Sequence, residues 1–315
     1  MQTSAITLIS NADFIGELIR DCNYIGLVTS NKQESFLNVP AAFDIETSSF
    51  YSDDVKCAIT YEWTFGIGYI KDGEFSRLKT YGRTWEQFKT LLGCVTAVLG
   101  LTEKRRLVVY VHNLPYEWQF MRKHFDWTKV FFIDQRKPVY AINDMGIEFR
   151  CSLKLSGKSL ANTAKDLLKY KAKKMVGDLD YSLIRTPETP LTQTELGYCE
   201  ADVEVILCYI QEKIEQEGDI TRIPLTKTGY VRRYCKNACF PESEVQENED
   251  PYAELDFECP GVSRTERVLS GRVYPRQCSP DRDYSHEGWL FRLFEFLSSG
   301  YGSVQVSNEQ RRVHR

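Results

Sequence analysis

Apolar and polar positions alternate along several short stretches of the chain and recur with a helical period along others. Strands are predicted at residues 41–46, 61–69, 75–80, 107–112, 130–133, 139–142 and 147–151. Helices are predicted at residues 84–99, 116–125, 159–168 and 195–216. Three strands precede the first of these helices, and a buried apolar strand follows it. This order predicts a mixed α/β domain with helices packed against one sheet.

The last 75 residues have a different composition from the rest. Residues 1–240 hold 19 lysines, yet no lysine follows Lys236. The net charge is +1 over residues 1–240 and −5 over residues 241–315. An acidic stretch with little hydrophobic periodicity is typical of a disordered tail. The chain is therefore divided into a folded domain over residues 1–225, a basic connecting segment over 226–254 and an atypical, unstructured tail over 255–315.

Composition excludes several classes of protein. No apolar run approaches the roughly 20 residues that a membrane span needs, and the first ten residues lack the basic and apolar regions of a secretory signal. The ten cysteines form no CxxC pair and the histidines number only four, which argues against a disulfide framework or a structural zinc site. We therefore expect a cytoplasmic protein with reduced thiols and no membrane partner, located in the host cytoplasm if the chain is viral.

Two acids at the end of a predicted strand are the first candidates for chemistry. Asp44 and Glu46 follow apolar residues and lie two positions apart. Because side chains alternate across a strand, both carboxylates point to one face, where a single divalent cation could touch them. Taken alone, the same DxE pattern also fits an ordinary solvated strand end.

Three further polar residues lie on predicted helices. Glu117 falls in a first helical turn, where the helix dipole favours an anion. Tyr198 and Asp202 are four residues apart on the 195–216 helix and therefore share a face. Taken singly, Glu117 fits a helix-start acid, and the Tyr198–Asp202 pair fits an amphipathic contact.

The four acids together favour metal-dependent chemistry. Mg²⁺ and Mn²⁺ prefer carboxylate oxygens, and two such ions about 4 Å apart can activate water and stabilise the leaving oxygen of a phosphodiester. Tyr198 would supply an orienting hydroxyl. No histidine cluster, serine elbow or glycine-rich phosphate loop in the sequence offers a competing site.

The same residues form three motifs in order. The set resembles the DEDDy 3′→5′ exonuclease domain of family B DNA polymerases, in particular the protein-primed branch of phages and linear plasmids. The first motif is Phe43-Asp44-Ile45-Glu46-Thr47, the second is Asn113-Leu114-Pro115-Tyr116-Glu117, and the third is Tyr198-Cys199-Glu200-Ala201-Asp202. The resemblance covers roughly residues 35–237 and implies a ribonuclease H-like fold, a mixed sheet flanked by helices.

The resemblance also implies the roles of the catalytic residues. Asp44, Glu46 and Asp202 would hold the first of two Mg²⁺ or Mn²⁺ ions, and Asp44 with Glu117 the second. Tyr198 would orient the attacking water. A lysine near the scissile phosphate is also implied, and Lys174 or Lys173 would serve, because Val176 stands in the expected neighbourhood. The chain departs from the family in having Glu117 where the usual acid is Asp.

Contacts to the single-stranded 3′ end follow from the same resemblance. The positions implied are Thr47, Asn113, Tyr116, Phe120, Ser152, Leu153 and Tyr181. Aromatic faces stack on bases, and hydroxyl and amide groups bond to sugar and phosphate. The segment 224–233 resembles the connection to the polymerase body, and its Arg232 and Arg233 suit phosphate contact, although a solvated helix has the same composition.

Polymerase motifs are missing from the sequence as it stands, but a shifted reading frame permits two of them. Read from the second base of each codon, residues 272–278 permit Gly-Phe-Thr-His-Ala-Asn-Ala, and residues 292–302 permit Asp-Phe-Ser-Ser-Ser-Tyr-Pro-Ala-Val-Met. Both resemble elements of the family's polymerase domain. We therefore hypothesise a frameshift upstream of about Leu255, so that residues 255–315 are an out-of-frame remnant.

The function expected is that of the exonuclease portion of a protein-primed DNA polymerase, in replication and proofreading. Its partners would be the 3′ end of single-stranded DNA and, for the intact polymerase, a primer terminal protein; polymerisation by this chain is not expected. Two alternatives stay open. One is a stand-alone DEDDy exonuclease, and the other is a non-catalytic module that binds single strands or a terminal protein.

Overall fold

A computed structural model of the chain describes residues 7–30, 32–175, 180 and 183–239. The chain divides into two units, Met1–Glu242 and Ser243–Arg315, of which the second lies outside the described residues. The predicted tail over residues 255–315 and the candidate Tyr181 lie outside them as well. The structure therefore bears on the first unit alone.

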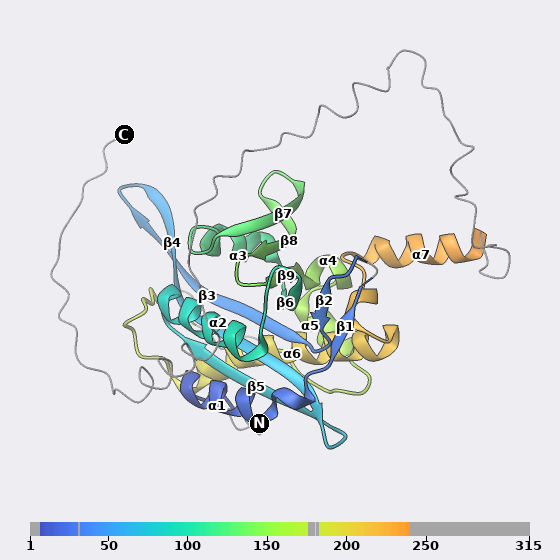
Figure 1. Ribbon diagram of the computed structural model, residues 1–315. Coiled ribbons are helices and arrows are strands. Elements are labelled where there is room, and N and C mark those ends of the chain that lie inside the picture. The colour runs from blue at the N-terminus through green and yellow to red at the C-terminus, as the bar shows by residue number, and fades with distance from the viewer. Residues whose placement is uncertain (1–6, 31, 176–179, 181–182, 240–315) are drawn as a thin grey trace, which may run out of the picture. The chain divides into compact units, whose positions relative to one another are not determined.

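One mixed sheet organises the described residues (Figure 1). Its main path runs β5-β4-β3-β6-β9-β8-β7, and β2 pairs with β1 and β6 beside this path. The bounds are β1 Leu27–Thr29, β2 Ser35–Leu37, β3 Ala41–Ser52, β4 Val55–Lys71, β5 Glu74–Gly82, β6 Arg105–Val111, β7 Trp127–Asp134, β8 Lys137–Asn143 and β9 Ile147–Cys151. The central β6 pairs parallel with β2, β3 and β9, whereas the remaining pairs are antiparallel hairpins.

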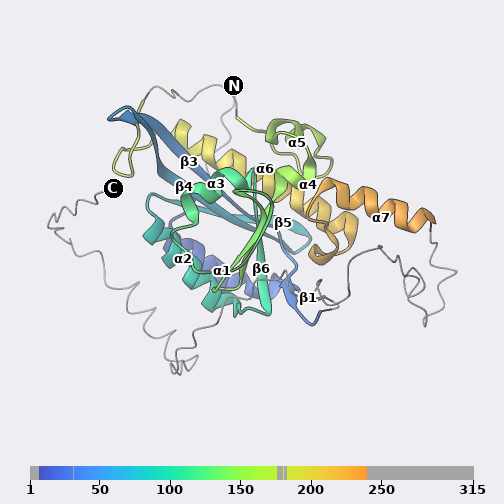
Figure 2. The same ribbon diagram turned by 90° about the horizontal axis from the view of Figure 1, so that it is seen from above.

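Helices cover both faces of the sheet. Their bounds are α1 Asn11–Asp21, α2 Trp85–Leu99, α3 Leu114–Met121, α4 Ser152–Ser156, α5 Leu160–Asp166, α6 Gln193–Glu217 and α7 Lys227–Cys239, with 3₁₀ turns at Cys22–Tyr24 and Ile220–Arg222. Figure 2 shows α1 and α2 on one side of the sheet and α6 on the other. The expected mixed α/β domain, a mixed sheet flanked by helices, is confirmed.

Alternation along β3 decides which residues face which helix layer. Ala42 packs into the core cluster formed with α6, whereas the ring of its neighbour Phe43 stacks on Phe88 of α2 at 4.3 Å. Residues two and four positions after Ala42 therefore face α6. These residues are Asp44 and Glu46, so the candidate acids lie between the sheet and the longest described helix.

Both long helices that frame the sheet begin at well-formed caps. Thr84 before α2 and Thr192 before α6 each accept a bond from the third helical residue, whose side chain bonds back to the cap. Such capping boxes satisfy amide groups that a helix start otherwise leaves without partners. The start of α6 fixes the rotation of the helix, and hence the direction of Tyr198 and Asp202.

Candidate functional site

Three of the predicted acids meet between β3 and α6. One carboxylate oxygen from each of Asp44, Glu46 and Asp202 lies within 4.8 Å of the other two. β3 supplies two of these acids from one face of the strand, and α6 supplies the third. Three oxygen ligands at this spacing fit one hard divalent cation, for which Mg²⁺ and Mn²⁺ are the usual choices.

Glu117 lies beside this group as a fourth buried acid. Its side chain is 3% exposed, and its Oε2 atom has no hydrogen-bond partner. The charge of Glu117 contributes to the raised pKa of Asp44, and burial followed by the charge of Glu46 raises the pKa of Glu117. The Oδ1 atom of Asp202 is likewise buried without a partner. Buried carboxylate oxygens without donors are costly, and a bound cation would satisfy them.

Burial raises the pKa of every acid in the group, and repulsion by neighbouring acids adds to this for all of them except Asp202. Burial is the largest cause for Asp44, followed by the charges of Glu117, Asp202 and Glu46. Burial likewise raises the pKa of Glu46 to about 8, and it raises the pKa of Glu117 and of Asp202. Acids this close together ionise readily only when positive charge is supplied. The donor set therefore fits a divalent cation.

Lys174 supplies one positive charge from the protein. Its Nζ atom donates to Oδ2 of Asp202 at 2.7 Å and lies 5.4 Å from the centre of the Tyr198 ring. Tyr198 precedes Asp202 by one turn of α6 and is 9% exposed. The neighbouring Lys173 is exposed and has no such contact among the described residues. Of the two lysines considered from the sequence, Lys174 is the one that reaches the acids.

Glu62 is a fifth acid that sequence reasoning missed. It lies on β4 directly across from Glu46, is fully buried, and accepts a bond from Thr64 Oγ1 at 2.7 Å. Burial raises the pKa of Glu62 to about 7, and its charge is, after burial, the largest cause of the raised pKa of Glu46. The available signal was an acid at an alternate position within an otherwise apolar and aromatic strand.

The residues predicted to hold a nucleic-acid strand begin next to the acids. Oγ1 of Thr47 and the hydroxyl of Tyr116 are 2.5 Å apart, and the ring of Tyr116 lies 5.4 Å from that of Phe120. The Tyr116 side chain is 43% exposed, so its ring is open to a ligand. Asn113 has a left-handed backbone (φ 77°) at the start of α3, which turns the chain from β6 into that helix.

Other predicted strand-binding residues lie further from solvent or from the acids. The Ser152 hydroxyl is 2% exposed and bonds to His112 Nδ1 and the Val111 carbonyl, with the half-buried Leu153 next in sequence. Arg233 pairs with Glu217 at 2.7 Å, at the end of α6, about 22 Å along the helix from Asp202. Arg232 and Arg233 both belong to α7, and the Arg232 side chain is exposed. The structure does not bring these two arginines to the acids.

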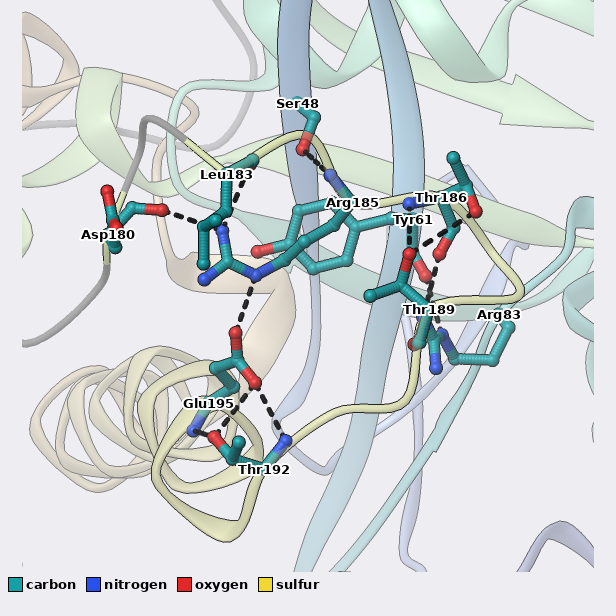
Figure 3. A network of polar contacts seen from close by, with 10 residues as sticks. All are labelled: Ser48, Tyr61, Arg83, Asp180, Leu183, Arg185, Thr186, Thr189, Thr192 and Glu195. Atoms are coloured by element: carbon teal, nitrogen blue, oxygen red, sulfur yellow. Dashed lines mark hydrogen bonds and ion pairs between the residues drawn. The ribbon is translucent and has the colours of Figure 1, made fainter.

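A buried arginine, Arg185, links the loop before α6 to β3 (Figure 3). The backbone amide of Arg185 donates to Ser48 Oγ at 2.9 Å, and its Nε donates to Glu195 at 2.5 Å. Its Nη1 donates to the carbonyls of Asp180 and Leu183. The backbone amide of Arg185 thus ties the loop to β3, and its side chain ties the loop to the first turn of α6.

A second arginine holds the other end of the same loop. Arg83 donates from Nε to the Tyr61 carbonyl at 2.7 Å and from Nη2 to the carbonyls of Thr186 and Thr189 at 3.0 and 2.7 Å. Figure 3 shows the Arg185 side chain, which belongs to the loop, beside the Tyr61 ring, and Arg83 near Thr186 and Thr189. The Arg185 guanidinium lies 5.8 Å from the Tyr61 ring. The loop is therefore fixed at both ends.

Within the described residues, no helix is long and apolar enough to pass through a lipid bilayer.

Comparisons with known proteins give a likeness at the level of solved structures. No protein-family model matches the chain, and no curated protein does. Phi29 DNA polymerase complexed with primer-template DNA and incoming nucleotide is similar over 65% of this chain and 35% of that one, with 17% identity and a TM-score of 0.46. The same polymerase complexed with single-stranded DNA gives 17% identity and a TM-score of 0.47 over 65% and 36% of the two chains. The chain thus spans about a third of the length of these polymerases.

Proposed function

We propose that the chain is the 3′→5′ exonuclease portion of a protein-primed family B DNA polymerase, with a ribonuclease H-like fold. The observation that carries the proposal is the meeting of Asp44, Glu46 and Asp202 within 4.8 Å, with Lys174 bonded to Asp202. The three acids come from two motifs far apart in the sequence, and Glu117 of the remaining motif lies beside them. A mixed sheet flanked by helices is consistent with this fold.

Each residue of the candidate site has a role in the proposed reaction. Asp44, Glu46 and Asp202 would hold one divalent cation, and Asp44 with Glu117 a second. Such cations, when bound, lower the pKa of water and neutralise the oxygen that leaves the phosphorus. Tyr198 orients the attacking water through its hydroxyl, and Lys174 places an ammonium next to the scissile phosphate.

The substrate would be the 3′ end of single-stranded DNA. Tyr116 and Phe120 offer rings for the terminal bases, and Thr47 offers a hydroxyl next to Glu46. The water oxygen forms a bond to phosphorus while the bond to the 3′ oxygen of the preceding nucleotide breaks. That oxygen takes up a proton, and a nucleoside 5′-monophosphate is released.

The decisive experiment is mononucleotide release by the full chain from a 3′-labelled single strand, with Mg²⁺ or Mn²⁺. We expect Asp44→Asn to lower kcat by roughly a thousandfold or more and to leave strand binding intact. Asp54→Asn, an exposed acid at the β3–β4 turn, is the matched control. Equal turnover by wild type and Asp44→Asn would contradict the proposal.

The same assay separates the two alternative functions. RNA cleaved as fast as DNA would favour a stand-alone exonuclease. Strand binding without metal-dependent release would favour a non-catalytic module, for which the Glu117 departure is the best support.

We further propose that residues 255–315 are an out-of-frame remnant and that the intact protein would carry polymerase activity and meet a primer terminal protein. The test is the nucleotide sequence of the gene from codon 240 past its stop codon. An open shifted frame that continues into further polymerase motifs is the expected result. A shifted frame that closes at once would contradict the hypothesis and favour a self-standing nuclease.

A further inference from the structure

A trough lies next to the candidate site. It is at the C-terminal end of α3, whereas Glu117 is in the first turn of that helix. Its volume is about 460 Å³, and it lies between the base of the β3–β4 hairpin, the start of α2 and the end of α3. Of the residues predicted to hold a strand, the trough shares Phe120 alone. It is therefore a separate surface that begins where the predicted strand-binding residues end.

Polar and aromatic contacts fix the walls of the trough. The loop residue Pro187 lines it and lies in sequence between Thr186 and Thr189, whose carbonyls accept bonds from Arg83. On the helix side, the ring of Trp85 stacks on His124 at 4.7 Å with an angle of 11° between the rings. A surface held in this way needs little ordering when a ligand binds.

The chemistry of the trough favours a phosphodiester. Arg122 and Lys123 are exposed on its rim, and neither side chain forms an ion pair within the described residues. Glu86, on the opposite wall, is the acid that lines it. Two cations without acidic partners, beside an aromatic ring, are the combination that binds single-stranded nucleic acid.

Contacts between side chains lead from the acids to this trough. Thr47 follows Glu46 on β3 and bonds to Tyr116, whose ring contacts Phe120, and Phe120 lines the trough. We propose that the trough binds the nucleotides 5′ to those held at the site, with their phosphates on Arg122 and Lys123 and a base against Phe120. The inference rests on the proposed exonuclease function, which it extends upstream along the strand.

The experiment measures kcat/KM of the full chain on single-stranded DNA two to eight nucleotides long. For wild type we expect kcat/KM to rise with length, and the ratio of the eight-nucleotide to the two-nucleotide value is the readout. Arg122→Ala/Lys123→Ala should lower this ratio about tenfold or more at 0.1 M salt. For the longest substrate, the slope of log kcat/KM against log salt concentration should also become shallower by roughly 1.4, since each phosphate contact contributes about 0.7 to that slope.

Lys104→Ala/Arg105→Ala is the matched control. This adjacent pair is also exposed, but it stands at the start of β6, about 20 Å along the strand from its end near His112. The control should keep the wild-type ratio. If wild type releases mononucleotides but the trough variant keeps the wild-type ratio and salt dependence, the inference is overturned and the proposed function is not. Failure of wild type to release mononucleotides from any length would instead overturn the proposed function.

Discussion

Lys174 brings a positive charge close to the acids of the candidate site. Its ammonium bonds to Asp202 and lowers the pKa of Asp44 and Glu46 by its charge, against the larger effect of burial. Burial alone would lower the pKa of Lys174, but the charge of Asp202 and the bond to it outweigh burial and raise the pKa, so the group stays protonated. A fixed cation beside a developing phosphate charge is effective because it needs no rearrangement during the reaction.

We expect Lys174→Met to lower kcat roughly a hundredfold, because one preorganised cation is lost from the reacting phosphate. Single-turnover release from a labelled strand at saturating Mg²⁺ measures the effect. Lys173→Met, the exposed neighbour, is the matched control and should stay within about twofold of wild type. A larger loss in the control than in Lys174→Met would show that the other lysine serves the site.

The raised pKa of Glu46 predicts how stability depends on pH in the absence of metal. The carboxyl titrates near 8 in the folded chain and near its ordinary value of 4.5 when unfolded, so its protonated form favours folding. Its contribution is fully present below about pH 4.5 and is lost as the pH rises to about 8.

The measurement is the free energy of unfolding of wild type against Glu46→Gln in chelator. The wild type should lose stability relative to the variant between about pH 5 and 8, by at most ~1.4 kcal/mol per pH unit. Saturating Mg²⁺ should reverse the trend, because cation binding requires the ionised carboxylate. A difference that does not change with pH would contradict the assignment.

Sequence alone could place some of these residues and not others. Asp44 and Glu46 could be placed on one face because strand alternation is a local rule. Glu62 stands out as an acid in an apolar strand, but its position opposite Glu46 could not be predicted, because it depends on the register of β3 against β4. That register changes between Glu46 and Thr47, where β4 contains one extra residue, Tyr61, and no local pattern specifies it.

At the scale of elements, the loop over residues 183–192 connects β3 to the start of α6 through hydrogen bonds. Arg185 carries the connection, since it bonds to Ser48 and to Glu195, the residue that closes the capping box of α6. The Arg185–Glu195 pair is buried, with side chains 7% and 12% exposed. Breaking such a pair leaves a charge without a partner in a dry environment.

We expect Arg185→Met to lower the free energy of unfolding by about 3 kcal/mol and to reduce cleavage by displacing the start of α6. Arg77→Met is the matched control, because Arg77 on β5 also pairs with an acid of α6, Glu204, in a partly exposed pair that should contribute under about 1 kcal/mol. Chemical denaturation measures both. Equal losses in the two variants would show that the loop does not depend on Arg185.

The elements were predicted best where apolar residues recur with a clear period. β5, β6, β8, β9, α2 and α6 lie within a few residues of the expected ranges. β3 and β4 are much longer than expected, because their outer residues, 47–60, are mostly polar and are held by the hairpin ladder and not by burial. α1 and the short β1 and β2 were missed, although α1 buries Phe14 and Leu18 completely.

For the whole molecule, the order of strands was beyond sequence reasoning. β6 lies between β3 and β9 and pairs parallel with both, although β4, β5, β7 and β8 intervene in the chain. Parallel pairing across long connections depends on the complete core and leaves no local signal. The hairpins β4–β5 and β7–β8, by contrast, join neighbours in sequence.

A chain ending at residue 242 should behave like the full chain, since the first unit, Met1–Glu242, is compact by itself. We expect its Tm within about 2 °C of the full chain and its cleavage rate within about twofold. A chain ending at residue 225 should have a lower Tm, because it lacks α7 and the Arg233–Glu217 pair. Loss of cleavage at 242 would show that the tail contributes to function.

The long sequence separation between β3 and α6 has a consequence for the order of events during synthesis. Asp44 and Glu46 leave the ribosome early, whereas Asp202 follows only after every strand of the sheet. At usual elongation rates this gap lasts roughly 10 to 30 s. Under the proposed function, the ligand set is completed last, so a nascent chain would have no nuclease centre until nearly its whole domain has emerged. Nearby nucleic acid would then stay uncut while the protein is being made.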